Sequence, residues 1–339
     1  MRNCASDWHI QATTFGIRHW RCYMKRTRLP TVTRTYQNHH LDSTRWRIYS
    51  PRDDDIIIST SYKAGTTWTQ MIVALLIFQD TDFPAPVMEM APWIGFRPMP
   101  LDDVRAILDA QTHRRFIKSH LALDGQPYYE QVKYICVGRS PLDVFMSLLN
   151  HYGAYTEGAY EDFNDTPGRV GDPFPRFEDN IPKLWDQWIN RGWFDWEPEG
   201  YPYWSHMHHA RTWWEFRHLP NILHVHYNDM KADLAGQMQR IAAYLDIDVA
   251  EDKWPTLVQA ATFDSMKNNS DNVTGEKISR IFEGGSKRFI NKGTNERWRG
   301  ILTDENLKRY EEVRDKEMEP ACARWLEAGS LVSGDPKDV

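Results

Sequence analysis

Short apolar runs that end in polar turns alternate along the chain with longer segments of helical character. Residues 56–60, Ile-Ile-Ile-Ser-Thr, are typical of a strand that is buried on both faces, and the mostly apolar residues 69–78 predict a buried helix. Further strands are predicted at residues 115–118, 133–138 and 221–226, and further helices at residues 140–152, 204–217, 229–245 and 303–318. This alternation predicts an α/β fold whose central, mainly parallel sheet is covered by helices on both faces.

The two ends of the chain stand outside this pattern. Residues 1–34 are expected to be an N-terminal tail. Residues 1–23 lack clear periodicity and Met24 precedes a basic stretch, so this tail is either disordered or the product of a wrongly assigned start codon. Residues 35–330 are expected to form a single domain, followed by a C-terminal tail at residues 331–339.

Two long segments predict the surroundings of a site. Residues 153–203 are rich in Gly, Pro, Asp and aromatic residues, and we expect loops and short helices that form a lid or a substrate wall. Residues 268–295 are polar and contain four glycines, which predicts a long loop over a site. Seven of the 15 tryptophans lie between Trp185 and Trp214. They are a candidate acceptor wall, although core packing explains most of them individually as well.

Composition and charge restrict the class of protein. The 339 residues carry a formal net charge of −6, which favours neither nucleic acid nor an anionic membrane, so a phosphate-bearing partner needs a local cationic site. The longest purely apolar run, residues 71–78, is far shorter than the roughly 20 residues of a membrane-spanning helix. There is no apolar signal stretch at the start, and the four cysteines show no CxxC spacing. We therefore expect a cytoplasmic protein without disulfides.

The turn after the first predicted strand has the chemistry of an anion site. Residues 61–68 read Ser-Tyr-Lys-Ala-Gly-Thr-Thr-Trp. A strand that delivers a short loop onto a helix N-terminus directs free backbone N–H groups toward one spot, which suits a phosphate, and Lys63 adds a full charge. The P-loop consensus is not met because Lys63 precedes the single glycine, Gly65. Taken alone, the loop is equally compatible with an ordinary turn that carries a solvated lysine.

This loop resembles the 5′-phosphosulfate-binding loop of the cytosolic-type sulfotransferase family, Tyr-Pro-Lys-Ser-Gly-Thr-Thr-Trp, with identities at Lys63 and at residues 65–68. Residues 134–147, Tyr-Ile-Cys-Val-Gly-Arg-Ser-Pro-Leu-Asp-Val-Phe-Met-Ser, resemble that family's 3′-phosphate segment. The resemblance spans about residues 35–325 and is greatest to bacterial glycolipid-type members. It implies a three-layer, P-loop-like fold. It also implies transfer of a sulfuryl group from 3′-phosphoadenylyl sulfate (PAPS) to a hydroxyl acceptor, leaving adenosine 3′,5′-bisphosphate (PAP).

The resemblance also implies which residues bind the donor. Arg139 and Ser147 take the places that hold the 3′-phosphate, Trp68 would stack on adenine, and Tyr227 would reach the adenine edge. A guanidinium at the end of a strand suits this role, because open α/β sheets bind ligands there and arginine holds phosphate through paired hydrogen bonds. The full set of implied donor-binding residues is Lys63, Ala64, Gly65, Thr66, Thr67, Trp68, Arg139, Ser147, Tyr227, Phe263, Met266, Lys292 and Gly293.

The implied catalytic residues are His120, Lys63 and Lys118. Lys118-Ser119-His120 matches the family's Lys-x-His step, which supplies a base and a cation. The acceptor hydroxyl must lose its proton as its oxygen attacks sulfur, and a histidine titrates near neutrality. Lys63 and Lys118 would neutralise charge on the bridging oxygen. A sulfuryl group carries fewer charges than a γ-phosphoryl group, so no metal is expected. The histidines at 206, 208 and 209 lack an accompanying acid or cysteine pattern and are interpreted as surface or loop residues.

Two residues and one segment in the C-terminal part of the chain also depart from the family's pattern. Ala261 stands where many members have threonine, so a hydroxyl contact to the base is missing or shifted to Thr262. Asn291 replaces the arginine of the Phe-Met-Arg-Lys-Gly loop, which should weaken donor binding unless Arg288 takes its place. The Gly-Asp-Trp continuation of that loop is altered to Asn-Glu-Arg-Trp at residues 295–298.

Two other functions and several acceptors stay open. A P-loop-type small-molecule kinase would have Asp229 as its only candidate acid, and a nucleotide-binding module without turnover would leave Lys118 and His120 without a use. Residues 83–100 and 153–214 are expected to line the acceptor pocket. Their aromatic character favours an acceptor with an apolar or aromatic face, which phenols, steroids, lipids and glycolipids all have. The family's dimer segment is not reproduced at residues 299–304, and the oligomeric state stays open.

Overall fold

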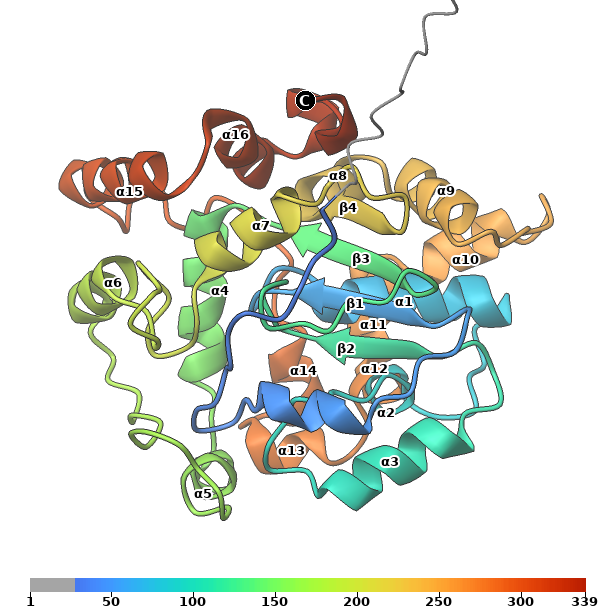
Figure 1. Ribbon diagram of the computed structural model, residues 1–339, viewed down its shortest axis with the longest axis horizontal. Coiled ribbons are helices and arrows are strands. Elements are labelled where there is room, and N and C mark those ends of the chain that lie inside the picture. The colour runs from blue at the N-terminus through green and yellow to red at the C-terminus, as the bar shows by residue number, and fades with distance from the viewer. Residues whose placement is uncertain (1–27) are drawn as a thin grey trace, which may run out of the picture.

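Four parallel strands form the centre of the protein, of which the computed structural model describes residues 28–339 (Figure 1). The strands are β1 (Ile56–Thr60), β2 (Phe116–Ser119), β3 (Lys133–Gly138) and β4 (Ile222–His226), in the spatial order β2-β1-β3-β4. In register, Ser59 of β1 lies opposite Ser119 on one side and Cys136 on the other. The four predicted strands are confirmed, with shifts of at most one residue at their ends.

Helices cover both faces of the sheet because successive strand residues point to opposite sides. Ile56 and Ile58 of β1 pack in one core with α1 (Thr66–Phe78) and α9 (Leu234–Tyr244). Ile57 packs in the other core with α4 (Pro141–Tyr152) and α7 (His206–Trp214). The predicted three-layer α/β architecture with a parallel central sheet is therefore confirmed.

The remaining helices surround these layers (Figure 1). They are α2 (Val87–Met90), α3 (Leu101–Ala110), α5 (Glu157–Asn164), α6 (Ile181–Asn190), α8 (Tyr227–Ala232), α10 (Trp254–Ala260), α11 (Phe263–Asn268), α12 (Ser270–Thr274), α13 (Ile278–Ile281), α14 (Gly285–Phe289), α15 (Asp304–Glu317), α16 (Pro320–Ala328) and α17 (Ser330–Ser333), with 3₁₀ turns η1 (Ser43–Ile48) and η2 (Pro336–Asp338).

Two predicted elements differ from the observed ones. The single helix predicted at residues 229–245 is divided into α8 and α9 at Asp233, which caps α9 by accepting a 2.9 Å hydrogen bond from the backbone N–H of Gly236. The long loop predicted at residues 268–295 contains the short helices α12, α13 and α14. Gly275 and Gly284, both with positive φ, separate these helices, and each helix is too short to show periodicity in the sequence.

Both described ends of the chain pack on the domain. Arg34, within the segment predicted as an N-terminal tail, pairs with Asp124 at 3.1 Å. At the other end, Asp335 pairs with Arg240 at 3.0 Å and Arg217 donates to the terminal Val339. The expectations for residues 1–23 lie outside the described residues. Between residues 28 and 339, no helix is long and apolar enough to cross a membrane.

Candidate active site

The predicted site residues gather where the strands end. β1 continues to β2 on one side of the sheet, whereas β3 continues to β4 on the other, so the loops after β1 and β3 leave in opposite directions. Such a switch point is where open α/β sheets bind ligands. Lys63 follows β1 and Arg139 follows β3, and Arg139 Nη1 donates a 3.0 Å hydrogen bond to the Lys63 carbonyl. The two motifs found in the sequence therefore meet at this edge.

The loop before α1 adopts an unusual backbone. Lys63 and Gly65 both have positive φ, of 60° and 118°. A Cβ at Gly65 would lie 3.1 Å from the Tyr227 ring, so both conformation and space require glycine there. The carbonyl of Gly65 accepts from Thr69 N as α1 starts, which leaves the N–H groups of the preceding turn without helical partners. Residues 65–68 thus offer backbone donors at the start of α1.

Lys63 is held in place by two aromatic groups. Its Nζ donates to Nδ1 of His151 at 3.2 Å and lies 4.8 Å from the centre of the Phe289 ring. Burial, together with the charges of Arg139, Lys118 and Arg297, lowers the pKa of Lys63 to about 7. A bound anion would oppose this effect and favour the charged amine.

Arg139 is buried but forms no ion pair within residues 28–339. Its guanidinium lies 4.0 Å over the Tyr227 ring, and Nη2 donates to Asn295 at 3.1 Å. Asp143 on α4 accepts a 2.6 Å hydrogen bond from the backbone N–H of Glu296. The Nε of Arg139 is buried without a partner in this part of the chain, a donor that an anionic ligand would satisfy.

His120 has a defined tautomer. Its Nδ1 donates a 2.8 Å hydrogen bond to the carbonyl of Thr60, since a carbonyl only accepts. Burial, with the charge of Lys118, holds the pKa of His120 well below its usual value, so the ring is neutral near pH 7. In a neutral ring with Nδ1 protonated, Nε2 carries the lone pair, and no hydrogen bond engages Nε2 among the described residues. The geometry leaves a free proton acceptor at the strand ends.

Lys118 lies on β2, two residues before His120. Its Nζ is 4.8 Å from the centre of the Trp93 ring, and burial lowers its pKa to about 8. Trp93 also meets the His120 ring edge-on at 4.8 Å. The same indole therefore contacts both the Lys118 amine and the His120 ring.

The predicted nucleoside residues form a second group at α1 and α11. Trp68 Nε1 donates to the carbonyl of Ala261 at 2.8 Å, and its ring meets Tyr227 edge-on at 5.2 Å. Phe263 lies against Gly293, where a Cβ would come within 2.6 Å of the Phe263 ring. The hydroxyl of Thr262, considered for a base contact, instead donates to the Gln259 carbonyl at 2.8 Å. This places Trp68, Tyr227, Phe263 and Gly293 around the start of α1.

The other predicted donor residues differ in their surroundings. Ala64 and Thr66 are buried, and Thr66 shares a 2.5 Å hydrogen bond with the Thr60 hydroxyl. Met266 is buried in the core that contains α1, whereas Ser147 is half-buried on α4. Of the remaining three residues, Thr67 and Phe263 are half-buried and Lys292 is exposed.

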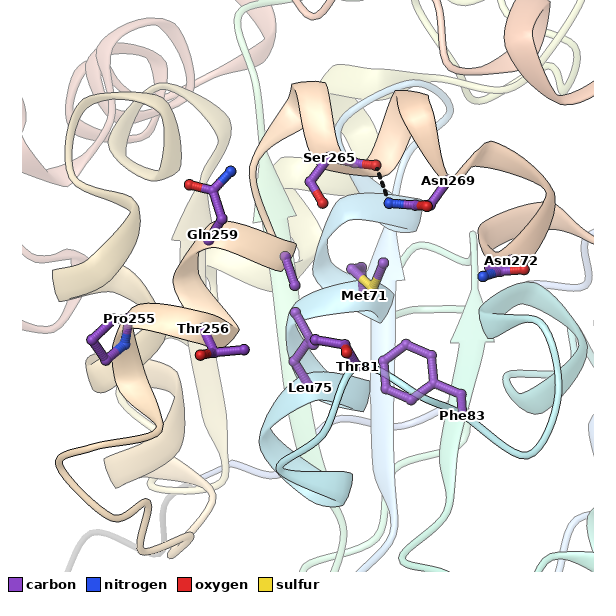
Figure 2. Close-up of a pocket in the computed structure, with 11 residues that line it drawn as sticks. Met71, Leu75, Thr81, Phe83, Pro255, Thr256, Gln259, Ser265, Asn269 and Asn272 are labelled. Carbon is purple, nitrogen blue, oxygen red and sulfur yellow. Dashed lines mark hydrogen bonds between the residues drawn. The ribbon is translucent and has the colours of Figure 1, made fainter.

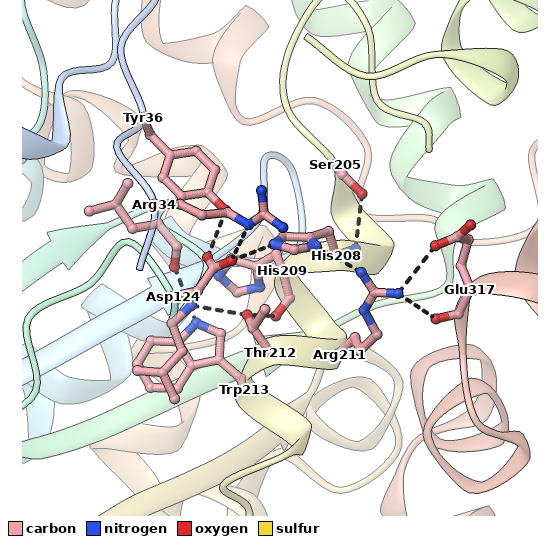
Figure 3. Close-up of polar contacts among 12 residues, drawn as sticks. Arg34, Tyr36, Asp124, Ser205, His208, His209, Arg211, Thr212, Trp213 and Glu317 are labelled. Atoms are coloured by element: carbon pink, nitrogen blue, oxygen red, sulfur yellow. Dashed lines mark hydrogen bonds and ion pairs between the residues drawn. The ribbon is translucent and has the colours of Figure 1, made fainter. Parts of the chain in front are cut away.

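The histidines at 206, 208 and 209 are not surface or loop residues, and that interpretation was wrong. They lie on α7 and are at most 4% exposed. His206 Nε2 donates to the Arg139 carbonyl at 2.7 Å, and its Nδ1 accepts from the Ser61 hydroxyl. His208 donates to Asp124 at 2.9 Å (Figure 3). Nε2 of His209 lies 3.1 Å from the Ser59 hydroxyl. Because α7 packs between the sheet and α15, this polar segment is interior.

The sulfotransferase domain family matches residues 53–321 of the chain. This chain belongs to the sulfotransferase family. A glycolipid sulfotransferase of Mycobacterium bovis is 33% identical over 319 residues, covering 87% of this chain and 94% of that protein. A luciferin sulfotransferase of Photinus pyralis is 29% identical over 304 residues, covering 80% of this chain and 74% of that protein. The predicted enzyme class is confirmed.

Two solved structures share the fold of this sulfotransferase. Retinol dehydratase in complex with androsterone and inactive cofactor PAP matches with a TM-score of 0.61 at 23% identity, covering 80% of this chain and 82% of that chain. A mouse sulfotransferase complexed with PAP matches with a TM-score of 0.61 at 20% identity, covering 82% and 89%. The predicted P-loop-like fold is thereby confirmed.

Residues of this sulfotransferase that the sequence did not assign to the site also lie around His120. Tyr62 stacks on His120 with ring centres 4.7 Å apart, and its hydroxyl donates to His40 Nε2 at 2.6 Å. His40 Nδ1 in turn donates to Nδ1 of His39, whose Nε2 donates to the Pro202 carbonyl at 3.0 Å. Burial lowers the pKa of both histidines and so keeps them neutral. Their neutral state fixes the direction of the hydrogen bonds that run from Tyr62 to Pro202. The only signal in the sequence was Tyr62 itself, in place of the family's proline.

Two further features lie apart from the residues above. Asp229, the candidate acid of a kinase, accepts from the backbone of Ser330 at 2.7 Å and of Leu331 at 3.2 Å, and so holds α17. A cavity of about 640 Å³ lies beside α1, α10 and α11 (Figure 2). Met71 and Leu75 contribute its apolar side, and Ser265 is the neighbour of Met266.

No group of three or more His, Cys, Asp or Glu side chains that suits a metal ion occurs in residues 28–339.

Proposed function

We propose that this sulfotransferase transfers the sulfuryl group of PAPS to a hydroxyl group of a small-molecule or lipid acceptor, with His120 as general base. The observation that carries the proposal is the orientation of His120. Thr60 fixes the proton on Nδ1, and Nε2 is left free beside Lys118. A general base needs this combination of a neutral ring and an unengaged lone pair.

Donor binding is supported by the cationic residues at the switch point. Lys63 and the backbone N–H groups at the start of α1 suit the 5′-phosphosulfate, and Arg139 suits the 3′-phosphate. The unpartnered Nε of Arg139 fits this assignment, because a phosphate oxygen would satisfy it. Trp68 and Tyr227 offer aromatic surface for the adenine.

The chemical step uses these groups in defined roles. The acceptor oxygen forms a bond to sulfur, the bond between sulfur and the bridging oxygen breaks, and the hydroxyl proton passes to Nε2 of His120. The bridging oxygen leaves with the 5′-phosphate and gains negative charge. Lys63 and Lys118 lower the energy of that charge in a site where aromatic side chains exclude water.

The acceptor is proposed to have an apolar or aromatic face, as a glycolipid does. Tyr62, Trp93 and Trp204 surround His120, at ring-centre distances of 4.7, 4.8 and 6.1 Å. The indole of Trp204 also donates to the His120 carbonyl at 2.8 Å, which fixes this wall relative to the base. The relative named a glycolipid sulfotransferase supports the same acceptor class.

Transfer of labelled sulfate from PAPS to a panel of phenols, steroids, lipids and glycolipids tests the function. The reaction should proceed in the presence of EDTA and should require the hydroxyl of the acceptor. Labelled product from a glycolipid supports the proposed class, whereas product only from phenols would replace it. Binding of PAP without transfer to any acceptor would contradict the proposal and favour a nucleotide-binding module.

A further inference from the structure

Arg297 presents a second buried guanidinium donor close to Arg139. The Nε atoms of Arg139 and Arg297 are both buried without a hydrogen-bond partner among residues 28–339. Buried polar groups are almost always satisfied, so two such donors in one region indicate a ligand that accepts from both. Neither side chain forms an ion pair in this part of the chain that would account for its charge.

The segment that carries Arg297 is fixed against the 3′-phosphate motif. Asn295 accepts from Arg139 at 3.1 Å and donates to Asn228 at 2.7 Å. The next residue, Glu296, donates its backbone N–H to Asp143 on α4 at 2.6 Å. Arg297 follows directly. Burial is the main cause of the lowered pKa of Lys63 and of Arg139, and the charge of Arg297 contributes to both shifts.

Arg299, two residues after Arg297, has different surroundings. Arg299 is exposed, pairs with Glu296 at 2.8 Å and lies 4.6 Å over the Trp298 ring. Arg299 therefore has the partners of an ordinary surface arginine, whereas the half-buried Arg297 has none that the described residues provide. The contrast makes Arg299 a matched control for Arg297.

The two changes in this loop complement each other. Asn291 stands where the family's pattern has arginine, and Arg297, just before Trp298, stands where Gly-Asp-Trp has aspartate. The backbone of Asn291 is held by Lys267 at 2.5 Å, and Arg288 is exposed without a contact to Arg139 in the described structure. Of Asn291, Arg288 and Arg297, Arg297 is the residue whose charge, in addition to burial, lowers the pKa values of Lys63 and Arg139.

We propose that Arg297 binds the 3′-phosphate of PAPS and PAP beside Arg139 and supplies the guanidinium that Asn291 does not. This inference rests on the proposed function, because it assigns a residue to the same donor. On this assignment, the unpartnered Nε atoms of Arg139 and Arg297 both donate to the 3′-phosphate. The negative charge of the ligand would also offset the mutual repulsion of Lys63, Arg139 and Arg297.

Calorimetric titration with two nucleotides tests the assignment. Adenosine 5′-monophosphate lacks the 3′-phosphate, whereas PAP has it. Arg297→Gln should weaken PAP binding by about 10- to 100-fold, the range for a hydrogen bond to a charged group, and leave binding of adenosine 5′-monophosphate unchanged. Arg299→Gln should bind both as the wild type does. Unchanged PAP affinity in Arg297→Gln, or equal losses for both nucleotides, would overturn the inference.

Two measurements keep the outcome interpretable. Wild-type protein that fails to bind PAP would contradict the proposed function itself, whereas wild-type binding with an unaffected Arg297→Gln variant contradicts only the role of Arg297. If Arg297→Gln does not fold, Arg297→Lys provides the same comparison. The lysine keeps the charge but loses the planar fork, so PAP affinity should fall several-fold, and an affinity equal to that of the wild type would count against the inference.

Discussion

Nδ1 of His120 donates a 2.8 Å hydrogen bond to the backbone carbonyl of Thr60. The contact joins the end of β1 to the residue that follows β2, so the pairing of two neighbouring strands sets the tautomer of the proposed base. The Thr60 hydroxyl also bonds Thr66, the first residue of α1. The base and the proposed phosphosulfate loop are thereby held by one short segment.

Binding of the nucleotide should be accompanied by proton uptake by the protein above neutral pH. The pKa of Lys63 is lowered to about 7 and that of Lys118 to about 8 in the free protein, so both amines lose charge as the pH rises through these values. A bound anion raises both pKa values, and PAP binding at about pH 8 should therefore consume protons. Calorimetry in buffers of different ionisation enthalpy measures this uptake, which Lys63→Met should reduce. An equal proton balance in both proteins would contradict the role of Lys63.

Removing the Tyr62 hydroxyl should destabilise the protein. Tyr62→Phe leaves the buried Nε2 of His40 without its donor, which costs about 1–3 kcal/mol of unfolding free energy. Tyr201→Phe is the control, because no hydrogen bond of its hydroxyl is seen in the described structure. Denaturant unfolding of both variants makes the comparison. Equal stability of the two variants would show that the Tyr62–His40 contact contributes nothing.

Asn291→Arg should tighten PAP binding by about tenfold, the effect of one hydrogen bond to a charged group. The substitution restores the family's arginine in the loop that resembles the one closing over the 3′-phosphate. Titration calorimetry with PAP gives the comparison with the wild type. Unchanged affinity would mean either that residues 289–293 are aligned incorrectly with that loop or that Arg297 already fills the place of that arginine.

Local patterns were sufficient to predict the centre of the fold. The strand ends and the two motifs depend on short runs such as residues 56–68 and 133–147, whose apolar period and turn residues are visible without partners. The break at Asp233 was missed because the apolar pattern continues through it, and only the capping contact to Gly236 shows where α9 starts.

Contacts between distant residues were not predictable in the same way. His40 and Tyr62 are 22 positions apart, and Lys63 and His151 are 88 apart, so neither pair leaves a local pattern. His206 was misinterpreted because a polar run on a helix usually faces water, whereas α7 is covered on both sides. Five of the seven tryptophans of this region, including Trp185 and Trp204, are buried in the core, and Trp204 also contacts the proposed base.

Single-turnover sulfuryl transfer by His120→Ala, measured together with its affinity for PAP, tests the central proposal most directly. Loss of the base should slow transfer by about 10²- to 10⁴-fold, while PAP affinity stays near that of the wild type because His120 is assigned to the acceptor proton. His218→Ala, at an exposed histidine that takes no part in these contacts, should retain full turnover. Wild-type turnover in His120→Ala would contradict the assignment of His120 as the base.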